Sequence, residues 1–194
     1  MDDGTLRQWD SNARTRRFRK DLTFWLAKKQ KGRCSYCSLQ TGAVGHRGRS
    51  LDHLVPKSAV NGVPEWSFEI ENLILSCDYC NTKLKKRYNP LVSRGASYRS
   101  SSFAIYHPYL DRAGDHITGG YRGGADEPST PTHRSEKGRK TIELFRLTSV
   151  DLRELWHQEY RSAVERRERL SWRPSRRVQF MDAARELGTS KILE

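Results

Sequence analysis

The chain has 194 residues, enough for one medium-sized domain with helical extensions, and only 35% of them are hydrophobic. Its formal net charge of +13 predicts a polyanionic partner, with nucleic acid as the first candidate and an acidic protein or an anionic membrane surface as the second. No apolar stretch approaches the roughly 20 residues that span a bilayer, and residues 1–4 lack the basic and apolar regions of a secretory signal. These features exclude an integral membrane protein and predict a soluble, cytoplasmic one.

Residues 1–33 predict a basic N-terminal helix. One apolar stripe at helical spacing runs along residues 11–31 and consists of Phe18, Leu22, Trp25 and Leu26. Residues 7–33, beginning at Arg7, hold ten Lys or Arg against two Asp. Charge this one-sided favours a surface that contacts phosphates, and a solvated helix face is the alternative. The residues predicted to contact nucleic acid here are Arg16, Arg17 and Lys20.

All four cysteines of the chain form two Cys-x-x-Cys pairs, Cys34/Cys37 and Cys77/Cys80. In a reducing compartment such a set is more typical of a metal site than of disulfides. A two-residue spacer lets both thiolates of a pair reach one ion, and four sulfur ligands leave no open position on it. The sequence therefore predicts a structural zinc ion, with disulfides, a redox pair or an iron–sulfur cluster as alternatives.

Asp52 and His53 lie between the two pairs, Asn72 precedes the second pair, and Asn81 directly follows it. Hydrolysis of a phosphodiester needs a base for the attacking water and a cation for the phosphate. A neutral imidazole can be that base near pH 7, and the oxygens of Asp52 and Asn81 suit a hard cation such as Mg²⁺ or Mn²⁺. Asn72 is placed to hold the backbone or the ring of His53. Each residue alone is a weak signal, and the joint pattern is a strong one.

Residues 34–85 resemble the HNH (ββα-metal) endonuclease family in its zinc-stabilised form. The resemblance rests on the two cysteine pairs, on Asp52-His53-x-x-Pro-Lys, on Asn72-Leu and on the Asn81-x-Lys that directly follows the second pair. It implies that Asp52 and Asn81 bind the catalytic cation, that His53 is the general base, and that Asn72 braces this base. With Asn in the last position, the chain is an H-N-N variant.

A narrower resemblance covers residues 52–57, 72–73, 77–83 and the His-Pro segment 107–111. These stretches are similar to the HNH nuclease subunit of Septu-type antiphage systems. The resemblance implies a DNA substrate, a role in antiviral defence and an ABC-type ATPase as the partner protein.

The predicted fold class is α+β, with a zinc-stapled ββα core at residues 34–110 and flanking helices. Within this core, residues 51–55 and 72–76 predict strands, and a short basic helix or turn begins at residue 80. The glycine-rich residues 111–138 predict a flexible loop or linker. Residues 139–194 predict a helical region for partner docking, in which Pro174 interrupts one helix and Gly188 ends another that spans 178–187.

Residues 83–99 hold six Lys or Arg and no acid, which predicts a second phosphate-contacting surface formed by Lys83, Lys85, Lys86 and Arg87. His107 and His116 are interpreted as packing or surface histidines, with help to the leaving group as the alternative. Residues 151–177 mix eight Arg with five acids, which favours docking to a partner, with a plain structural helix as the alternative.

The sequence thus predicts a metal-dependent endonuclease that hydrolyses DNA. A zinc-dependent nucleic-acid-binding protein with inert nuclease-like residues is one alternative, and a nuclease directed at RNA is the other.

Overall fold

The computed structural model describes residues 12–42 and 47–186, with side chains described as far as residue 170. Its elements in chain order are α2 (Ala13–Lys29), β1 (Arg49–His53), the 3-10 turns η1 (Pro64–Trp66) and η2 (Ile70–Asn72), β2 (Leu73–Cys77), the π-helix η3 (Tyr79–Lys85), β3 (Leu91–Ser93), β4 (Ser102–Phe103), α3 (Ala113–His116), β5 (Ile117–Gly120), β6 (Ser129–His133), α4 (Glu136–Leu144) and α5 (Val150–Glu186). The strands form three separate antiparallel pairs. This mixture of helices and small sheets confirms the predicted α+β class.

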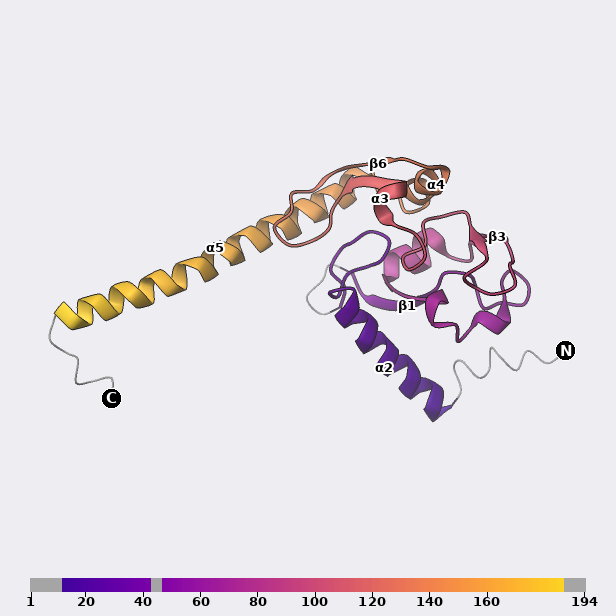
Figure 1. Ribbon diagram of the computed structural model, residues 1–194, viewed down its shortest axis with the longest axis horizontal. Coiled ribbons are helices and arrows are strands. Elements are labelled where there is room, and N and C mark those ends of the chain that lie inside the picture. The colour runs from indigo at the N-terminus through magenta and orange to yellow at the C-terminus, as the bar shows by residue number, and fades with distance from the viewer. Residues whose placement is uncertain (1–11, 43–46, 187–194) are drawn as a thin grey trace.

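The pair β1–β2 lies at the centre of the body, and α5 leaves that body as a long rod (Figure 1). The register of the β1–β2 pair sets Asp52 opposite Ile74 and His53 opposite Leu73. Paired residues share a face and successive residues alternate between faces. The Asp52 and His53 side chains therefore leave opposite faces of β1, and only the end of the strand can bring both to one place.

Helix α2 covers the face of the β1–β2 pair to which Leu73 belongs. Leu22 and Leu26 of the helix are buried against Leu73 and Leu75 of β2. The side chain of Asn12 caps the helix by accepting a hydrogen bond from the amide of Thr15 at 2.8 Å. The helix predicted for residues 11–31 is thus confirmed over Ala13–Lys29. Residues 1–11, with Arg7, lie outside the described residues.

The four cysteines converge in the main core, the cluster that also contains Ile74 of β2. All four are buried, and their sulfurs lie within 4.8 Å of one another. The sulfurs of Cys37 and Cys77 are 3.8 Å apart. A disulfide would need about 2.05 Å, whereas two ligands of a tetrahedral zinc ion at about 2.3 Å from the metal lie about 3.8 Å apart. The donor set and its spacing fit the predicted structural zinc.

The start of α5 packs onto the first cysteine pair. Trp156 is 2% exposed and donates from its indole nitrogen to the carbonyl of Cys37 at 2.7 Å. Glu159 of the same helix accepts from the amide of Gln40 at 2.7 Å and pairs with Arg33 at 2.8 Å. The helix is therefore fastened to the zinc knuckle at its first turns, before it leaves the body.

The prediction of a flexible loop at 111–138 is wrong. This stretch forms α3 and the β5–β6 hairpin, and Tyr121 within it is 3% exposed. Its glycines permit the positive φ angles at Gly119 and Gly120 that this irregular hairpin needs.

The predicted break at Pro174 is also wrong, because α5 runs as one helix from Val150 to Glu186. A proline removes one backbone hydrogen bond, but its φ angle is compatible with a helix. Gly188, predicted to end the last helix, lies outside the described residues. Over the described part of the chain, no helix has both the length and the apolar character needed to cross a bilayer.

Removing one thiol is expected to unfold the core. We predict that Cys37→Ser loses its bound zinc and its cooperative thermal transition, because structural zinc supplies about 10–16 kcal/mol of binding free energy to small domains. Metal analysis by mass spectrometry and circular-dichroism melting measure both effects. The control is Ser35→Ala, a change within the same knuckle that removes no ligand. Full zinc content and an unchanged transition in Cys37→Ser would contradict the assignment.

Candidate active site

A cleft of about 670 Å³ opens beside the end of β1. Within the described ranges 12–42 and 47–186 this sheet has two strands, so β1 has an open edge there, and residues from both of its faces can line this cleft. Asp52, His53 and Asn81 all line it, as does Lys85. The remaining lining residues are Leu51, Pro56, Lys57, Ser58, Val60, Asn61, Lys86 and Arg87. The structure thus brings together three of the four predicted catalytic residues.

His53 is 9% exposed, and its Nε2 lies 2.9 Å from the carbonyl oxygen of Ser67. A carbonyl can only accept, so Nε2 carries the proton. In the neutral ring Nδ1 is then the nitrogen that lacks one. Burial is the main cause that lowers the pKa of His53 to about 4, and the cations Lys57 and Lys85 lower it further. The ring is therefore neutral at pH 7 and has a basic nitrogen of defined position.

Asp52 is 5% exposed, and the side chains of Tyr36 and Lys85 donate to its carboxylate. The Tyr36 hydroxyl donates to one oxygen at 2.6 Å and the Lys85 ammonium donates to the other at 3.2 Å. Burial raises the pKa of Asp52, while Lys85 and the Tyr36 hydrogen bond oppose the rise. The Lys85 ammonium also donates to the backbone carbonyl of His53 at 2.8 Å. One buried cation therefore fastens both members of the Asp-His pair.

The prediction that Lys85 contacts nucleic acid at a surface is wrong. The residue is 2% exposed, and its ammonium is bound by Asp52 and by the His53 carbonyl. A buried ammonium is costly unless it is paired, so Lys85 belongs to the interior wall of the cleft. Lys85 lies among exposed cations in the sequence, so the sequence alone does not distinguish this buried lysine from its exposed neighbours.

Asn81 projects from the π-helix η3, a form of helix that occurs often at functional sites. Its amide nitrogen donates to the Ser50 hydroxyl at 2.7 Å. Ser50 lies two residues before Asp52 on β1, hence on the same face of the strand. The carboxamide and the carboxylate therefore line the same side of the cleft.

These two side chains form a donor set that can hold a hard cation. An ionised carboxylate has about four lone-pair sites, of which Tyr36 and Lys85 use two in Asp52. Asn81 adds one carbonyl oxygen. Mg²⁺ commonly binds through one or two protein oxygens and retains several waters, so a single carboxylate with one carboxamide fits its coordination habit.

The hydrogen bonds that the structure describes for the Asn72 side chain go to partners other than the imidazole. Asn72 is fully buried and lies outside the residues that line the cleft. Its side-chain oxygen accepts from the amide of Val55 at 2.7 Å, and its nitrogen donates to the carbonyls of Val55 and Trp66 at 3.0 Å. Val55 follows His53 by two residues, and Trp66 precedes Ser67, whose carbonyl holds Nε2. Asn72 is thus a positioning residue that fixes the backbone on both sides of the ring.

The outer wall of the cleft is a loop tied back on itself. The amide of Val63 donates to the carbonyl of Pro56 at 2.9 Å, and Asn61 donates to the carbonyl of Arg87 at 2.6 Å. A side chain at Gly62 would meet the Pro56 carbonyl at 1.8 Å, so this close approach requires glycine. The loop and the segment that follows η3 are therefore joined across the cleft.

Sequence reasoning missed Tyr36 and Ser67. Tyr36 lies inside the first cysteine pair, but no local signal indicates that its hydroxyl reaches Asp52. Ser67 acts through its backbone carbonyl, which leaves no side-chain signature at all.

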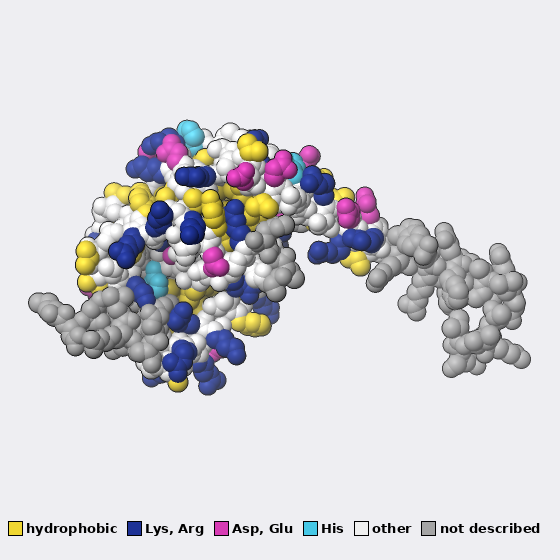
Figure 2. Space-filling view, turned by 180° about the vertical axis from the view of Figure 1, so that it is seen from behind, with side chains coloured by type: hydrophobic (Ala, Val, Ile, Leu, Met, Phe, Trp, Pro, Cys, Tyr) yellow, Lys and Arg dark blue, Asp and Glu magenta, His cyan; other side chains and the backbone are white. Residues whose placement is uncertain are grey.

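The other predicted nucleic-acid contacts are exposed. Lys and Arg side chains are spread over the body, and many lie in the lower half of the view in Figure 2, where few acidic side chains appear. The exposed candidates are Arg16, Arg17, Lys20, Lys83, Lys86 and Arg87. Lys86 and Arg87 also line the cleft.

Loss of the buried ammonium should destabilise the protein strongly. We predict that Lys85→Met costs about 3–5 kcal/mol of unfolding free energy, because it leaves the Asp52 carboxylate buried without its partner. Lys86→Met, at the exposed neighbouring position, should change stability by no more than about 0.5 kcal/mol. Urea unfolding at pH 7 without added Mg²⁺ measures both. Equal stabilities of the two variants would disprove the role of the ion pair.

Residues 34–87 match a family model described as HNH endonuclease. The matched range contains both cysteine pairs, all four predicted catalytic residues and every residue that lines the cleft. Comparison with curated proteins and with solved structures gave no match for the chain. The grouped thiols and the cleft thus coincide with the matched range, and the chain carries an HNH endonuclease domain at residues 34–87.

Proposed function

We propose that the protein is a metal-dependent endonuclease that hydrolyses phosphodiester bonds in DNA, with His53 as the general base. The observation that carries this proposal is the bond from His53 Nε2 to the Ser67 carbonyl, which leaves Nδ1 as the basic nitrogen of a buried, neutral ring. A general base must hold its proton-accepting atom in a fixed place and be unprotonated at the working pH. His53 meets both conditions in a cleft of about 670 Å³.

In the proposed reaction, water donates a proton to Nδ1 of His53 as its oxygen attacks phosphorus. The bond between phosphorus and the 3′-oxygen then breaks, the departing 3′-oxygen takes up a proton from solvent, and the 5′-phosphate stays on the other product. The oxygens of Asp52 and Asn81 would hold a divalent cation, which would neutralise charge on the phosphate and on the departing oxygen. Lys85 keeps the Asp52 carboxylate in place, and the resulting imidazolium returns its proton to solvent after the products leave.

Substrate binding is proposed to use the exposed cations near the cleft and on α2. Lys86 and Arg87 line the cleft and suit the phosphates that flank the scissile bond. Arg16, Arg17 and Lys20 form an exposed row on α2, the helix that packs on β2. Such contacts carry no base information, so we propose that cleavage depends on backbone geometry and not on a base sequence.

The narrower resemblance to Septu-type nuclease subunits extends this proposal to an assembly. We propose that the protein acts in antiphage defence together with an ABC-type ATPase, for which the helical region after residue 139 is the candidate docking element. Support comes from α5, which leaves the body and exposes four Arg and two Glu side chains between residues 161 and 169. Co-purification with the candidate ATPase, with and without residues 161–194, tests this extension and leaves the part of α5 that packs on the core in place.

Removal of the base should abolish cleavage. We predict that His53→Ala lowers the rate of nicking of supercoiled plasmid in Mg²⁺ or Mn²⁺ by about 10²–10⁴-fold, the usual contribution of general-base catalysis. His133→Ala is the matched control, since His133 is exposed and lies on β6, away from the cleft. Gel electrophoresis measures the products, and a parallel assay on single-stranded RNA tests the alternative substrate.

Tight, salt-sensitive DNA binding by the wild type without any metal-dependent product would instead identify a binding protein with inert nuclease residues. Undiminished cleavage by His53→Ala would reject the assigned base.

The pH dependence should reveal the environment of His53. A base works in its unprotonated form, so lowering the pH through about 4 should abolish activity, while no inflection should occur near the usual histidine value of about 6.5. The single-turnover rate between about pH 5.5 and 8 measures this, with zinc content checked at each pH. A tenfold loss between about pH 7 and 5.5 that tracks a histidine titration would contradict the buried, neutral ring.

A further inference from the structure

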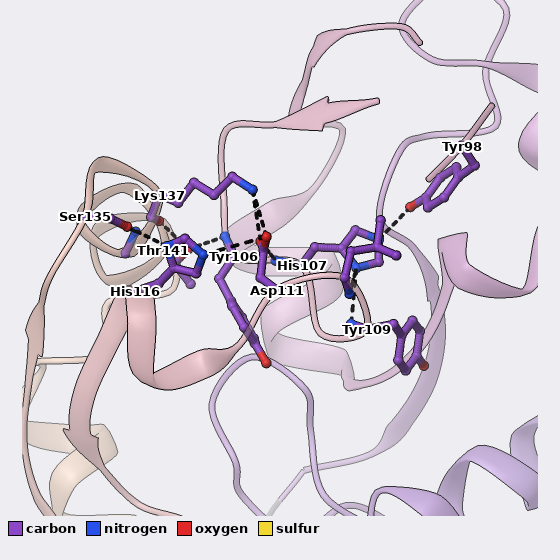
Figure 3. A network of polar contacts seen from close by, with 11 residues as sticks. Tyr98, Tyr106, His107, Tyr109, Asp111, His116, Ser135, Lys137 and Thr141 are labelled. Atoms are coloured by element: carbon purple, nitrogen blue, oxygen red, sulfur yellow. Dashed lines mark hydrogen bonds and ion pairs between the residues drawn. The ribbon is translucent and has the colours of Figure 1, made fainter. Parts of the chain in front are cut away.

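A buried chain of hydrogen bonds reaches the active-site turn from outside the HNH domain. It begins at His107, which is fully buried (Figure 3). Nδ1 of this histidine accepts from the amides of Tyr109 and Leu110 at 3.2 and 3.3 Å. Burial lowers the pKa of His107 to about 4, so the ring is neutral at pH 7. Because Nδ1 is an acceptor, the one proton of the neutral ring lies on Nε2. Nε2 therefore donates to the hydroxyl of Tyr98 at 2.9 Å.

The Tyr98 hydroxyl passes the chain on to Asn72. It is an acceptor for His107, and its own proton points to Asn72 Oδ1 at 3.2 Å. Tyr98 is 4% exposed and is packed edge-on against Trp66, with ring centroids 4.9 Å apart. Each hydrogen bond in this series therefore has a defined donor and a defined acceptor. Water cannot replace either partner unless the core opens.

Asn72 is the point where this chain meets the base. Its amide already holds Val55 and the carbonyl of Trp66, so the Tyr98 hydroxyl completes its set of partners. Val55 lies two residues after His53, and Trp66 adjoins the carbonyl that holds Nε2 of the base. A rotation of the Asn72 amide would release both segments together.

The far end of the chain is held by α4. The amide of His107 donates to Asp111 at 2.8 Å, and both oxygens of Asp111 accept from Lys137 at 3.0 Å. His116 approaches the same carboxylate at 3.6 Å. Figure 3 shows these side chains converging from α3, from α4 and from the segment between β4 and α3. Just beyond α4, the ring of Phe145 stacks on Tyr36 at 3.9 Å.

We propose that Tyr98 and His107 are positioning residues for catalysis. They hold the Asn72 amide, which binds the backbone that follows His53 and the backbone next to the carbonyl that holds the His53 ring. This inference rests on the proposed nuclease function. It assigns a role to residues beyond 34–87 and explains why a polar chain lies inside an apolar core. A purely structural chain would affect stability without changing the ring of His53.

The test removes one hydroxyl. Tyr98→Phe keeps the packed ring but deletes the link between His107 and Asn72. We expect kcat for a defined DNA duplex to fall by about ten- to a hundredfold with KM changed less than about twofold, because small displacements of a base are costly in rate and no substrate contact is removed. Tyr106→Phe is the control, since Tyr106 is a half-buried tyrosine whose hydroxyl takes no part in the chain. Equal kcat in both variants would overturn the proposal.

A second readout does not depend on activity. Nitrogen-15 NMR of the histidine ring should show one tautomer for His53 in the wild type, protonated at Nε2, and a mixture of tautomers in Tyr98→Phe. His107→Gln, whose amide can still donate to Tyr98, should retain more of the single tautomer than His107→Leu does. An unchanged His53 tautomer in Tyr98→Phe overturns the positioning role. If the wild type cuts nothing while the tautomer shifts as expected, the chain is confirmed and the proposed function fails.

Discussion

Four cysteine sulfurs within 4.8 Å of one another join two segments that are far apart in the sequence, and the rest of the core depends on that junction. Tyr36 lies inside the first pair, so the junction brings its hydroxyl to Asp52. Asn81 directly follows the second pair, so the same junction starts the π-helix whose residues line the cleft. The grouped thiols, which fit a structural zinc ion, therefore bring together side chains that line the cleft.

The charges around this core are balanced in pairs. The thiolates attract Arg47, which approaches the sulfur of Cys77 at 3.9 Å and lies over the ring of Tyr79 at 4.2 Å. Asp52 is balanced by Lys85 at 3.2 Å, and both residues are almost fully buried. A buried ion pair contributes little net stability, but it fixes geometry because neither partner can leave without the other. In this cleft it holds a carboxylate in one place beside a neutral imidazole.

The elements after residue 87 complete this arrangement. Trp156 of α5 binds the backbone of the first cysteine pair, and Phe145 stacks on the tyrosine that holds Asp52. Tyr98 and His107 reach the turn after His53 through Asn72. The HNH domain is thus supported from two directions by parts of the chain that lie outside it, and both lines of support originate near α4 and the start of α5.

The sequence by itself determined the ligand types of the candidate sites and the central elements. Two cysteine pairs, an Asp-His dipeptide and two asparagines at fixed intervals indicated zinc and a hydrolytic site, since ligand type and spacing are local properties of the chain. Helical periodicity predicted α2 for the same reason. The tertiary structure alone decided that Lys85 is an interior partner of Asp52 and that residues 111–138 fold into α3 and a hairpin. It also decided that the described hydrogen bonds of Asn72 go to the backbone of Val55 and Trp66 and to the hydroxyl of Tyr98. Burial and long-range hydrogen bonds produce these features, and both arise only when distant segments meet, so no local pattern of residues can specify them.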